Sequence, residues 1–440
     1  MLPDAEKAHP RLAALGRSTR SVADYYADVA NDPVVAPGDP VSRRLLARAA
    51  GSMVQQVFGP GCGDLGERLR DRAAAAVAAP RTVVSLAEHH ASITHPETTT
   101  VVAGEVLYAL ASGADTVLSF AGGTVPLDNE LFPRGAMVGW HKVPFLPRKF
   151  RRLSPVACPR MDTSLFRDGL RAAYKDGHLD AETYDEVGAW WAGTEPEIEA
   201  AGAYWQQISV LNLRTFERMF PSWSLSYVML PVELLTRDLL LACLDDAPDS
   251  WVLRHLFDAR LRMTLLKALD GVRTFWDSDS GKGTFLFWAA DDSGRLAPVG
   301  LDGGDLVTAD GTVRVPIAPG PLREAMAAGT LIPASSCVFL LLAFQTGLRN
   351  FGGLLQYDYL AEARQRLTRA TALDLTDAER RTIVDSPDSF YVNFEEKDAL
   401  SGGLARIARP IGEADLHTVG TEPMGRSIGG CLSWVDSLYS

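Results

Sequence analysis

Short apolar runs alternate with helically spaced apolar positions in the first half of this chain. Residues 82–87 and 116–120 are rich in β-branched and apolar residues, and between them residues 98–111 repeat apolar positions at helical spacing. Short, continuously apolar strands are typical of parallel sheets that helices cover on both faces. The pattern therefore predicts a strand–helix–strand crossover within an α/β fold whose sheet is mostly parallel and flanked by helices.

Later segments of the chain also predict secondary-structure elements. Residues 153–157 indicate a further short strand, and residues 226–235 an extended or buried segment. Residues 251–276 present a broad apolar face, which predicts one long helix. Between residues 283 and 317, apolar runs are separated by Asp-Gly and Ser-Gly sequences, which favour hairpin turns and thus a small antiparallel meander inserted into the α/β core.

The same pattern of apolar and polar positions divides the chain into four predicted parts. The first is helical and the second holds the parallel sheet, because the crossover begins where the helical pattern ends. The predicted parts are a helical lead-in (1–80), an α/β core with the candidate site (81–250), helices and the β-meander that complete the core (251–370), and a C-terminal segment (371–440).

Composition indicates an ordinary soluble globular protein. The chain has 440 residues, of which 47% are hydrophobic and 22% charged, so it can bury a sizeable core. Its formal net charge of -12 argues against binding to a phosphate backbone, and we expect no nucleic-acid partner. Arginine greatly outnumbers lysine, and alanine and glycine are frequent, a bias typical of a GC-rich bacterial genome.

The cysteines and the apolar runs predict a cytoplasmic location. The five cysteines are scattered and form no CxxC pair, which fits a reducing compartment better than a disulfide framework. The first residues lack the pattern of a secretory signal. The longest apolar run, residues 337–344, is too short for a spanning helix, so we expect no membrane partner.

The candidate chemistry is concentrated in residues 88–97. Three of the eight histidines, His89, His90 and His95, follow the first apolar run there. Histidine titrates near neutrality and is the commonest metal ligand, so this density points to metal ligation, general base catalysis, or both. The alternative is that the histidines only satisfy local carbonyl groups.

A helix start is predicted directly beside these histidines. Thr94 and Glu97 match a capping box with Pro96 in the first turn, so we expect a helix to begin at His95. The histidines would then lie in a strand-to-helix turn, where ligands of open α/β sheets bind. Glu97 is a candidate catalytic carboxylate and also a candidate helix cap.

The loop after the second apolar run supplies further candidates. Asp128 and Glu130 could complete a metal shell, Asn129 could bind substrate, and Arg134 could hold a carboxylate or phosphate. His141 follows this loop and could act as a base, although a lone histidine beside Trp140 is more often a packing residue. An ordinary solvated turn is the alternative for the loop itself.

A third group follows the apolar run at 337–344. Gln345, Arg349 and Asn350 could carry polar groups into a substrate pocket, because a few convergent polar groups give such pockets their specificity. The alternative is a glycine-capped helix end with a surface arginine.

These residues lead to the prediction of an enzyme that acts on a small polar metabolite. His90, His95 and a carboxylate from Asp128 or Glu130 would hold a divalent zinc or iron ion. The ion would polarise a substrate oxygen or activate water, which favours hydrolytic or lyase-type chemistry.

Other residues take the remaining roles in this prediction, and two other functions stay open. His89 or His141 would be the base, and Arg134 or Arg349 would anchor an anionic substrate group. One alternative is a metal-free transferase or ligase that binds a phosphate or nucleotide at the same helix N-terminus, and the other is a non-catalytic binding protein. In each case the partner is a small molecule, and a homo-oligomer is possible in each.

Overall fold

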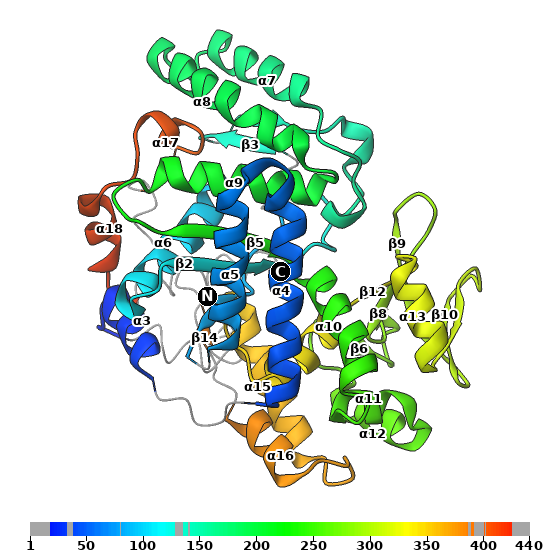
Figure 1. Ribbon diagram of the computed structural model, residues 1–440. Helices are drawn as coiled ribbons and strands as arrows, with labels where there is room; N and C mark the ends of the chain where they lie inside the picture. The colour runs from blue at the N-terminus through cyan, green and yellow to red at the C-terminus, as the bar shows by residue number, and fades with distance from the viewer. Residues whose placement is uncertain are drawn as a thin grey trace.

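A parallel sheet forms the centre of the molecule (Figure 1). The computed structural model describes residues 18–32, 38–79, 81–127, 135–139, 141–385, 389–390, 400 and 402–424. The sheet contains β1 (Val83–Ser85), β2 (Thr116–Ala121), β5 (Ser226–Pro231), β13 (Arg349–Gly352) and β14 (Ser389–Phe390). All neighbouring strands run parallel, in the order β14-β13-β1-β2-β5. The predicted parallel sheet with flanking helices is confirmed.

The order of the strands reverses at β1. The chain builds the sheet outward from β1 through β2 to β5, then returns to place β13 on the other side of β1. In open sheets of this kind, ligands bind beyond the carboxyl ends of the strands at the point of reversal. The loops that follow β1 and β13 therefore occupy the edge where a site is expected.

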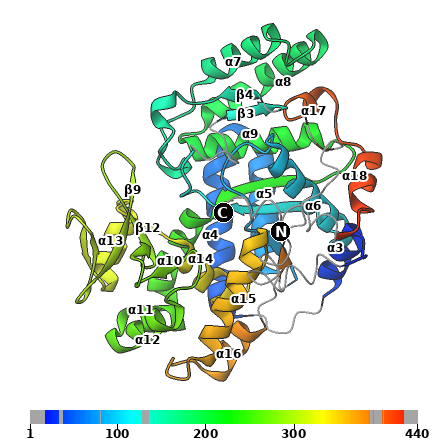
Figure 2. The same cartoon turned by 180° about the vertical axis from the view of Figure 1, so that it is seen from behind.

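Helices cover both faces of this sheet. Leu118 and Phe120 of β2 share a buried cluster with α4 (Pro40–Cys62) and α5 (Asp64–Ala78). Val117, which alternates with them, belongs instead to a cluster with α6 (Pro96–Ser112). Figure 1 shows α4 and α5 in front of the sheet, and Figure 2 shows α6 on the opposite side. The helical N-terminal part agrees with the prediction, and α4 continues through Pro60 to Cys62.

A second sheet is antiparallel, as predicted for the segment after residue 283. Its strands lie in the order β11-β10-β9-β8-β12, to the side of the parallel sheet (Figure 1). They are β8 (Phe287–Ala290), β9 (Leu296–Asp302), β10 (Asp305–Thr308), β11 (Arg314–Pro316) and β12 (Leu331–Pro333). The sheet extends past the predicted meander because β12 adds to β8 after α13 (Pro319–Ala327).

The remaining elements surround these two sheets. A short hairpin of β3 (Gly135–Val138) and β4 (His141–Pro144) packs against α7 (Thr163–Lys175), and β6 (Trp276–Asp277) pairs with β7 (Lys282–Gly283). The other helices are α3 (Val22–Asn31), α8 (Ala181–Ala200), α9 (Tyr204–Met219), α10 (Val232–Asp246), α14 (Ser335–Phe339), a π-helix (Leu340–Gln345), α15 (Leu354–Arg369), α16 (Asp377–Val384), α17 (Ala405–Ala408) and α18 (Glu413–Gly420). None of the helices in the described ranges is long and apolar enough to cross a bilayer.

Two element predictions were wrong. The strand expected at 153–157 is a 3-10 helix, Pro155–Ala157, because a proline opens it and cannot donate to a ladder. The long helix expected at 251–276 is divided into α11 (Trp251–Phe257) and α12 (Ala259–Leu269). Asp258 separates them because its side chain accepts a hydrogen bond from the Leu261 N–H at 2.8 Å and caps the second helix.

Candidate functional site

The histidine segment lies at the carboxyl edge of the parallel sheet, as the sequence predicts. Beyond β1 and β2, the Gly122 N–H donates to the Glu88 carbonyl at 2.8 Å, and the His90 N–H donates to the Gly122 carbonyl at 2.8 Å. These two bonds continue the parallel pairing past both strands. His89 and His90 are thereby fixed next to Gly122, before the chain turns into α6.

The start of α6 differs from the predicted capping box. His95, not Thr94, is the N-cap residue, and its Nδ1 accepts a hydrogen bond from the Glu97 N–H at 3.3 Å. Pro96 occupies the first helical position, where the missing N–H costs nothing. Thr94 Oγ1 instead accepts from the Met137 N–H of β3 at 2.9 Å. His95 therefore has a structural role at the helix end.

His90 is a fully buried, neutral imidazole. Its Nε2 lies 2.7 Å from the Trp205 carbonyl oxygen, so Nε2 carries the proton and donates it. Nδ1 is then an acceptor, and it has no hydrogen-bond partner among the described residues. Burial lowers the pKa of His90 to about 4, which keeps the ring uncharged at neutral pH.

His89 and Glu233 both lie close to Gly122. The position that a Gly122 Cβ would occupy is 3.7 Å from Cδ2 of His89 and 3.9 Å from Oε1 of Glu233. His89 is partly exposed, and desolvation lowers the pKa of its ring to about 4. A neutral imidazole and a carboxyl group therefore both lie beside Gly122 at the sheet edge.

Glu233 fixes the loop that follows β2. It stands in the first turn of α10 and accepts hydrogen bonds from the Gly123 N–H at 2.7 Å and from the Thr124 hydroxyl at 2.7 Å. The Thr124 N–H adds a third bond at 3.3 Å. Burial raises the pKa of Glu233, while these donors act in the opposite direction. Glu233 is not among the predicted site residues, and the only signal for it in the sequence is a carboxylate within an apolar stretch.

A second buried carboxyl group lies on the α6 side of the sheet. Glu88 accepts hydrogen bonds from the hydroxyl of Ser119 and from that of Tyr227, the latter at 2.9 Å, and Glu105 of α6 lies against it. Burial raises the pKa of Glu88 to about 7. Strongly perturbed carboxyl groups are concentrated at functional sites, although structural networks produce them as well. None of these four residues is among the predicted site residues, although Glu88 opens the histidine segment at 88–97.

Two predicted site residues lie elsewhere. The ring of His141 stacks on His178 with centroids 4.3 Å apart. Arg349 begins β13 and lies at the amino end of the sheet, opposite the histidine edge. Its guanidinium donates to the Val29 carbonyl at 3.1 Å and contacts the Asp32 carboxylate at 3.2 Å, where α3 ends. The structure therefore does not bring Arg349 to the histidines.

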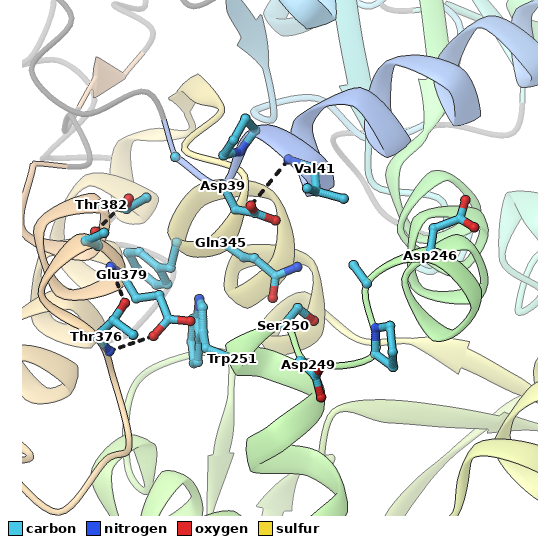
Figure 3. A pocket seen from close by; sticks show the side chains of 16 residues that line it. Asp39, Val41, Asp246, Asp249, Ser250, Trp251, Gln345, Thr376, Glu379 and Thr382 are labelled. Carbon is cyan, nitrogen blue, oxygen red and sulfur yellow. Dashed lines mark hydrogen bonds between the residues drawn. The ribbon is translucent and has the colours of Figure 1, made fainter.

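Gln345 and Asn350 also have partners within the protein. Gln345 Nε2 donates to the Ser42 hydroxyl at 2.8 Å, and Asn350 Oδ1 accepts from Gln356 at 3.2 Å. Gln345 lines a cavity of about 450 Å³ at the start of α4, where Figure 3 shows it with Asp39 and Trp251. This cavity is separate from the histidine edge.

The predicted metal set is incomplete in the described part of the chain. Asp128, Asn129, Glu130 and Arg134 lie outside the described residues. Within the described ranges, no group of three or more His, Cys, Asp or Glu side chains is placed to hold a metal ion. The zinc or iron ion therefore stays a prediction.

Comparisons with known proteins do not identify a family. No protein-family model matches the chain, and no match was found among curated proteins. The candidate function consequently rests on the fold and on the geometry of the histidine edge.

Proposed function

We propose that this protein is an enzyme that acts on a small polar metabolite by hydrolytic or lyase-type chemistry, with His89 and Glu233 facing the substrate. One observation supports this most directly. Both side chains lie beside Gly122, because Cδ2 of His89 and Oε1 of Glu233 are 3.7 Å and 3.9 Å from the position that a Cβ of this residue would occupy. Gly122 directly follows β2 at the carboxyl edge of the sheet, where open α/β folds bind their ligands.

His89 and Glu233 would have different roles in the proposed reaction. A neutral imidazole can accept a proton from a substrate hydroxyl or from water, which is the usual role of a catalytic histidine. Glu233 is held by three hydrogen bonds from Gly123 and Thr124, so its carboxyl group is fixed in place. It would orient the substrate and balance the positive charge that the imidazole acquires.

A divalent zinc or iron ion belongs to the same proposal. The donor types at this edge, imidazole and carboxylate, suit either metal. Nδ1 of His90 lacks a partner among the described residues, and Asp128 and Glu130 follow the loop that Glu233 holds. Such an ion would polarise a substrate oxygen.

We also propose a cytoplasmic location, because Cys62, Cys158, Cys243 and Cys337 are free thiols.

A screen of purified protein against hydrolysable and eliminable metabolites tests the proposal. His89→Gln and Glu233→Gln should each lower kcat by a factor of about 100 or more, because general acid–base groups contribute that much. His141→Gln, which removes the ring stacked on His178, is the matched control and should retain activity. Full activity in His89→Gln would refute the assignment. Elemental analysis of the same preparation decides whether zinc or iron is present in stoichiometric amount.

A second candidate function is a transferase or ligase that binds a phosphate or nucleotide. The strand order favours it, because α6 and α15 both begin at this edge on either side of the reversal. Gly353, the N-cap of α15, has no side chain to occupy the first N–H groups. Thermal stabilisation by ATP or pyrophosphate would support this function, and its absence together with hydrolytic activity would support the first.

A further inference from the structure

The cavity at the start of α4 has the size of a small-molecule site. Its volume is about 450 Å³, and ligand pockets usually have roughly 300–1,000 Å³. Four separate helices contribute to its wall, through Asp39 before α4, Trp251 of α11, Gln345 of the π-helix and Glu379 of α16 (Figure 3). The reaction proposed for the histidine edge uses none of these residues.

Gln345 is held rigidly in the wall of this cavity. Its Nε2 donates to the Ser42 hydroxyl at 2.8 Å, and its Oε1 accepts from the Val252 N–H at 3.3 Å. Its carbonyl oxygen accepts from the Asp39 N–H at 3.0 Å. Gln345 also ends a π-helix, a rare conformation that is frequent at functional sites. The wall is therefore organised before any ligand arrives.

The charge of the wall favours a cation. None of the described residues that line the cavity is a lysine, arginine or histidine, whereas four are carboxylates: Asp39, Asp246, Asp249 and Glu379. From outside the wall, Arg48 pairs with Asp246 at 2.7 Å and Arg254 with Glu379 at 3.1 Å. Asp39 caps α4 but, like Asp249, it forms no ion pair within the described residues. Two carboxylates of the wall are therefore without a counter-charge.

Trp251 adds a second and independent feature of a binding site. Its side chain is 2% exposed, and its indole N–H has no acceptor among the described residues. A buried indole N–H usually finds a partner, so an acceptor on a ligand would complete this group. Aromatic rings also attract cations. The wall thus suits an occupant that combines a positive charge with a hydrogen-bond acceptor.

We infer that this cavity is a second binding site, which takes a small organic cation with a hydrogen-bond acceptor, as an amino alcohol has. The ammonium group lies on the side of Asp39 and Asp249, and the hydroxyl oxygen accepts the indole N–H of Trp251. This inference is independent of the proposed function, because the two sites share no residue.

Isothermal titration calorimetry of the full-length protein tests the inference. The probe is 2-amino-1-phenylethanol, and its matched analogues are 1-phenyl-1,2-ethanediol, which is neutral, and mandelate, which is an anion. Asp39→Asn/Asp249→Asn removes both unpaired charges and keeps an N-cap residue, since asparagine caps as well as aspartate does. Trp251→Phe keeps a ring without the N–H. Asp185→Asn, an exposed position of α8, is the control.

The amine should bind at least about 10 times more tightly than the diol, and mandelate should not bind, because only the amine compensates the wall charge. The double variant should weaken binding of the amine by a factor of about 3 to 10, as the loss of partly exposed ion pairs does. Trp251→Phe should weaken it by a similar factor, as the loss of one hydrogen bond does. Asp185→Asn should bind it like the wild type.

The inference is overturned if the diol or mandelate binds as tightly as the amine, or if none of the three binds. It is also overturned if either the double variant or Trp251→Phe, with native circular dichroism, binds the amine like the wild type. Should a variant not fold, the comparison of the three probes on the wild type still decides. None of these results changes the expectations for His89 and Glu233, which are tested by activity.

Discussion

The phenol of Tyr227 donates a hydrogen bond of 2.9 Å to Oε2 of Glu88 and so connects β5 to the end of β1 across β2. Ser119 of the intervening β2 donates to the same oxygen. The Glu88 side chain is only 2% exposed, and Tyr227 and Ser119 are fully buried. Desolvation exceeds the effect of these donors and raises the pKa of Glu88 to about 7. Glu88 therefore keeps its proton at pH values where an exposed glutamate is ionised.

Glu88→Gln should remove a pH dependence of folding stability. The ordinary pKa of 4.5 rises to about 7 in the folded protein, so the unfolded chain ionises first as the pH increases. The wild type therefore loses up to about 3 kcal/mol of stability between roughly pH 4.5 and 7 through this one group. Glutamine stays neutral and does not contribute this loss. Urea unfolding measures the free energy of unfolding at pH 5 and pH 8. Relative to the wild type, the variant should be more stable at pH 8 than at pH 5.

Glu67→Gln is the matched control for this prediction, because Glu67 is an exposed glutamate of α5. Its difference from the wild type should be the same at both pH values. Parallel stability curves for Glu88→Gln and the wild type would show that the carboxyl group titrates normally and is not desolvated.

His90→Gln should make the protein more resistant to acid. The pKa of His90 falls from 6.5 to about 4 in the folded state, so the unfolded chain takes up a proton first as the pH decreases. This group costs the wild type up to about 3 kcal/mol between roughly pH 6.5 and 4. Glutamine can donate to the Trp205 carbonyl and does not titrate. Circular dichroism should show a lower acid midpoint for the variant, whereas His417→Gln, on the exposed side of α18, should leave the midpoint unchanged.

Arg349→Met should loosen α3 without changing chemistry at the histidine edge. The Arg349 side chain is 5% exposed, and it bonds the Val29 carbonyl and the Asp32 carboxylate at the end of α3. Its loss should cost about 2–4 kcal/mol and speed hydrogen exchange in α3, because a buried carbonyl loses a charged donor. Asp32→Asn changes the half-exposed partner and should cost less than about 1 kcal/mol. A raised KM with native stability in Arg349→Met would instead return Arg349 to substrate binding.

The crossover of β1, α6 and β2 was predictable because its strands and helix are close in sequence and carry clear periodicities. The order of the sheet was not predictable, since Val83 pairs with Arg349 across most of the chain. Local patterns specify an element but not its partner strand. The sequence for this reason did not show that Arg349 lies at the amino end of the sheet, away from the histidines.

For the candidate site too, the sequence predicted the local features but not the contacts made by distant segments. The position of His89 and His90 after a strand followed from the sequence, whereas Glu233 and Tyr227 reach this region from distant elements. The burial of Glu88 was not predicted because glutamate is rarely buried, and its desolvation becomes visible only in three dimensions. The cap of α6 was misplaced by one residue because a histidine ring nitrogen accepts the bond expected for Thr94.

Gly352→Ala and Gly353→Ala should differ sharply although the two glycines are adjacent. A Cβ on Gly352 would lie 2.5 Å from Cδ and 2.6 Å from Cβ of Gln356, whereas one on Gly353 meets nothing within 4 Å among the described residues. Gly352→Ala should cost about 1–3 kcal/mol, as overpacked sites do, and should break the 3.2 Å bond from Gln356 to Asn350. Gly353→Ala should lower the free energy of unfolding by about 1 kcal/mol or less, because alanine is a poorer N-cap residue than glycine.

A double-mutant cycle separates this steric effect from a general weakening of α15. Cβ of Gln356 itself lies 2.6 Å from the new methyl position, so truncating Gln356 to alanine does not relieve the clash. Gln356→Gly does, and the double variant Gly352→Ala/Gln356→Gly should therefore be more stable than the sum of its single changes implies. Urea unfolding of the four proteins measures this coupling. Strict additivity would show that the two positions do not touch, and the close approach of β13 to α15 would then have to be abandoned.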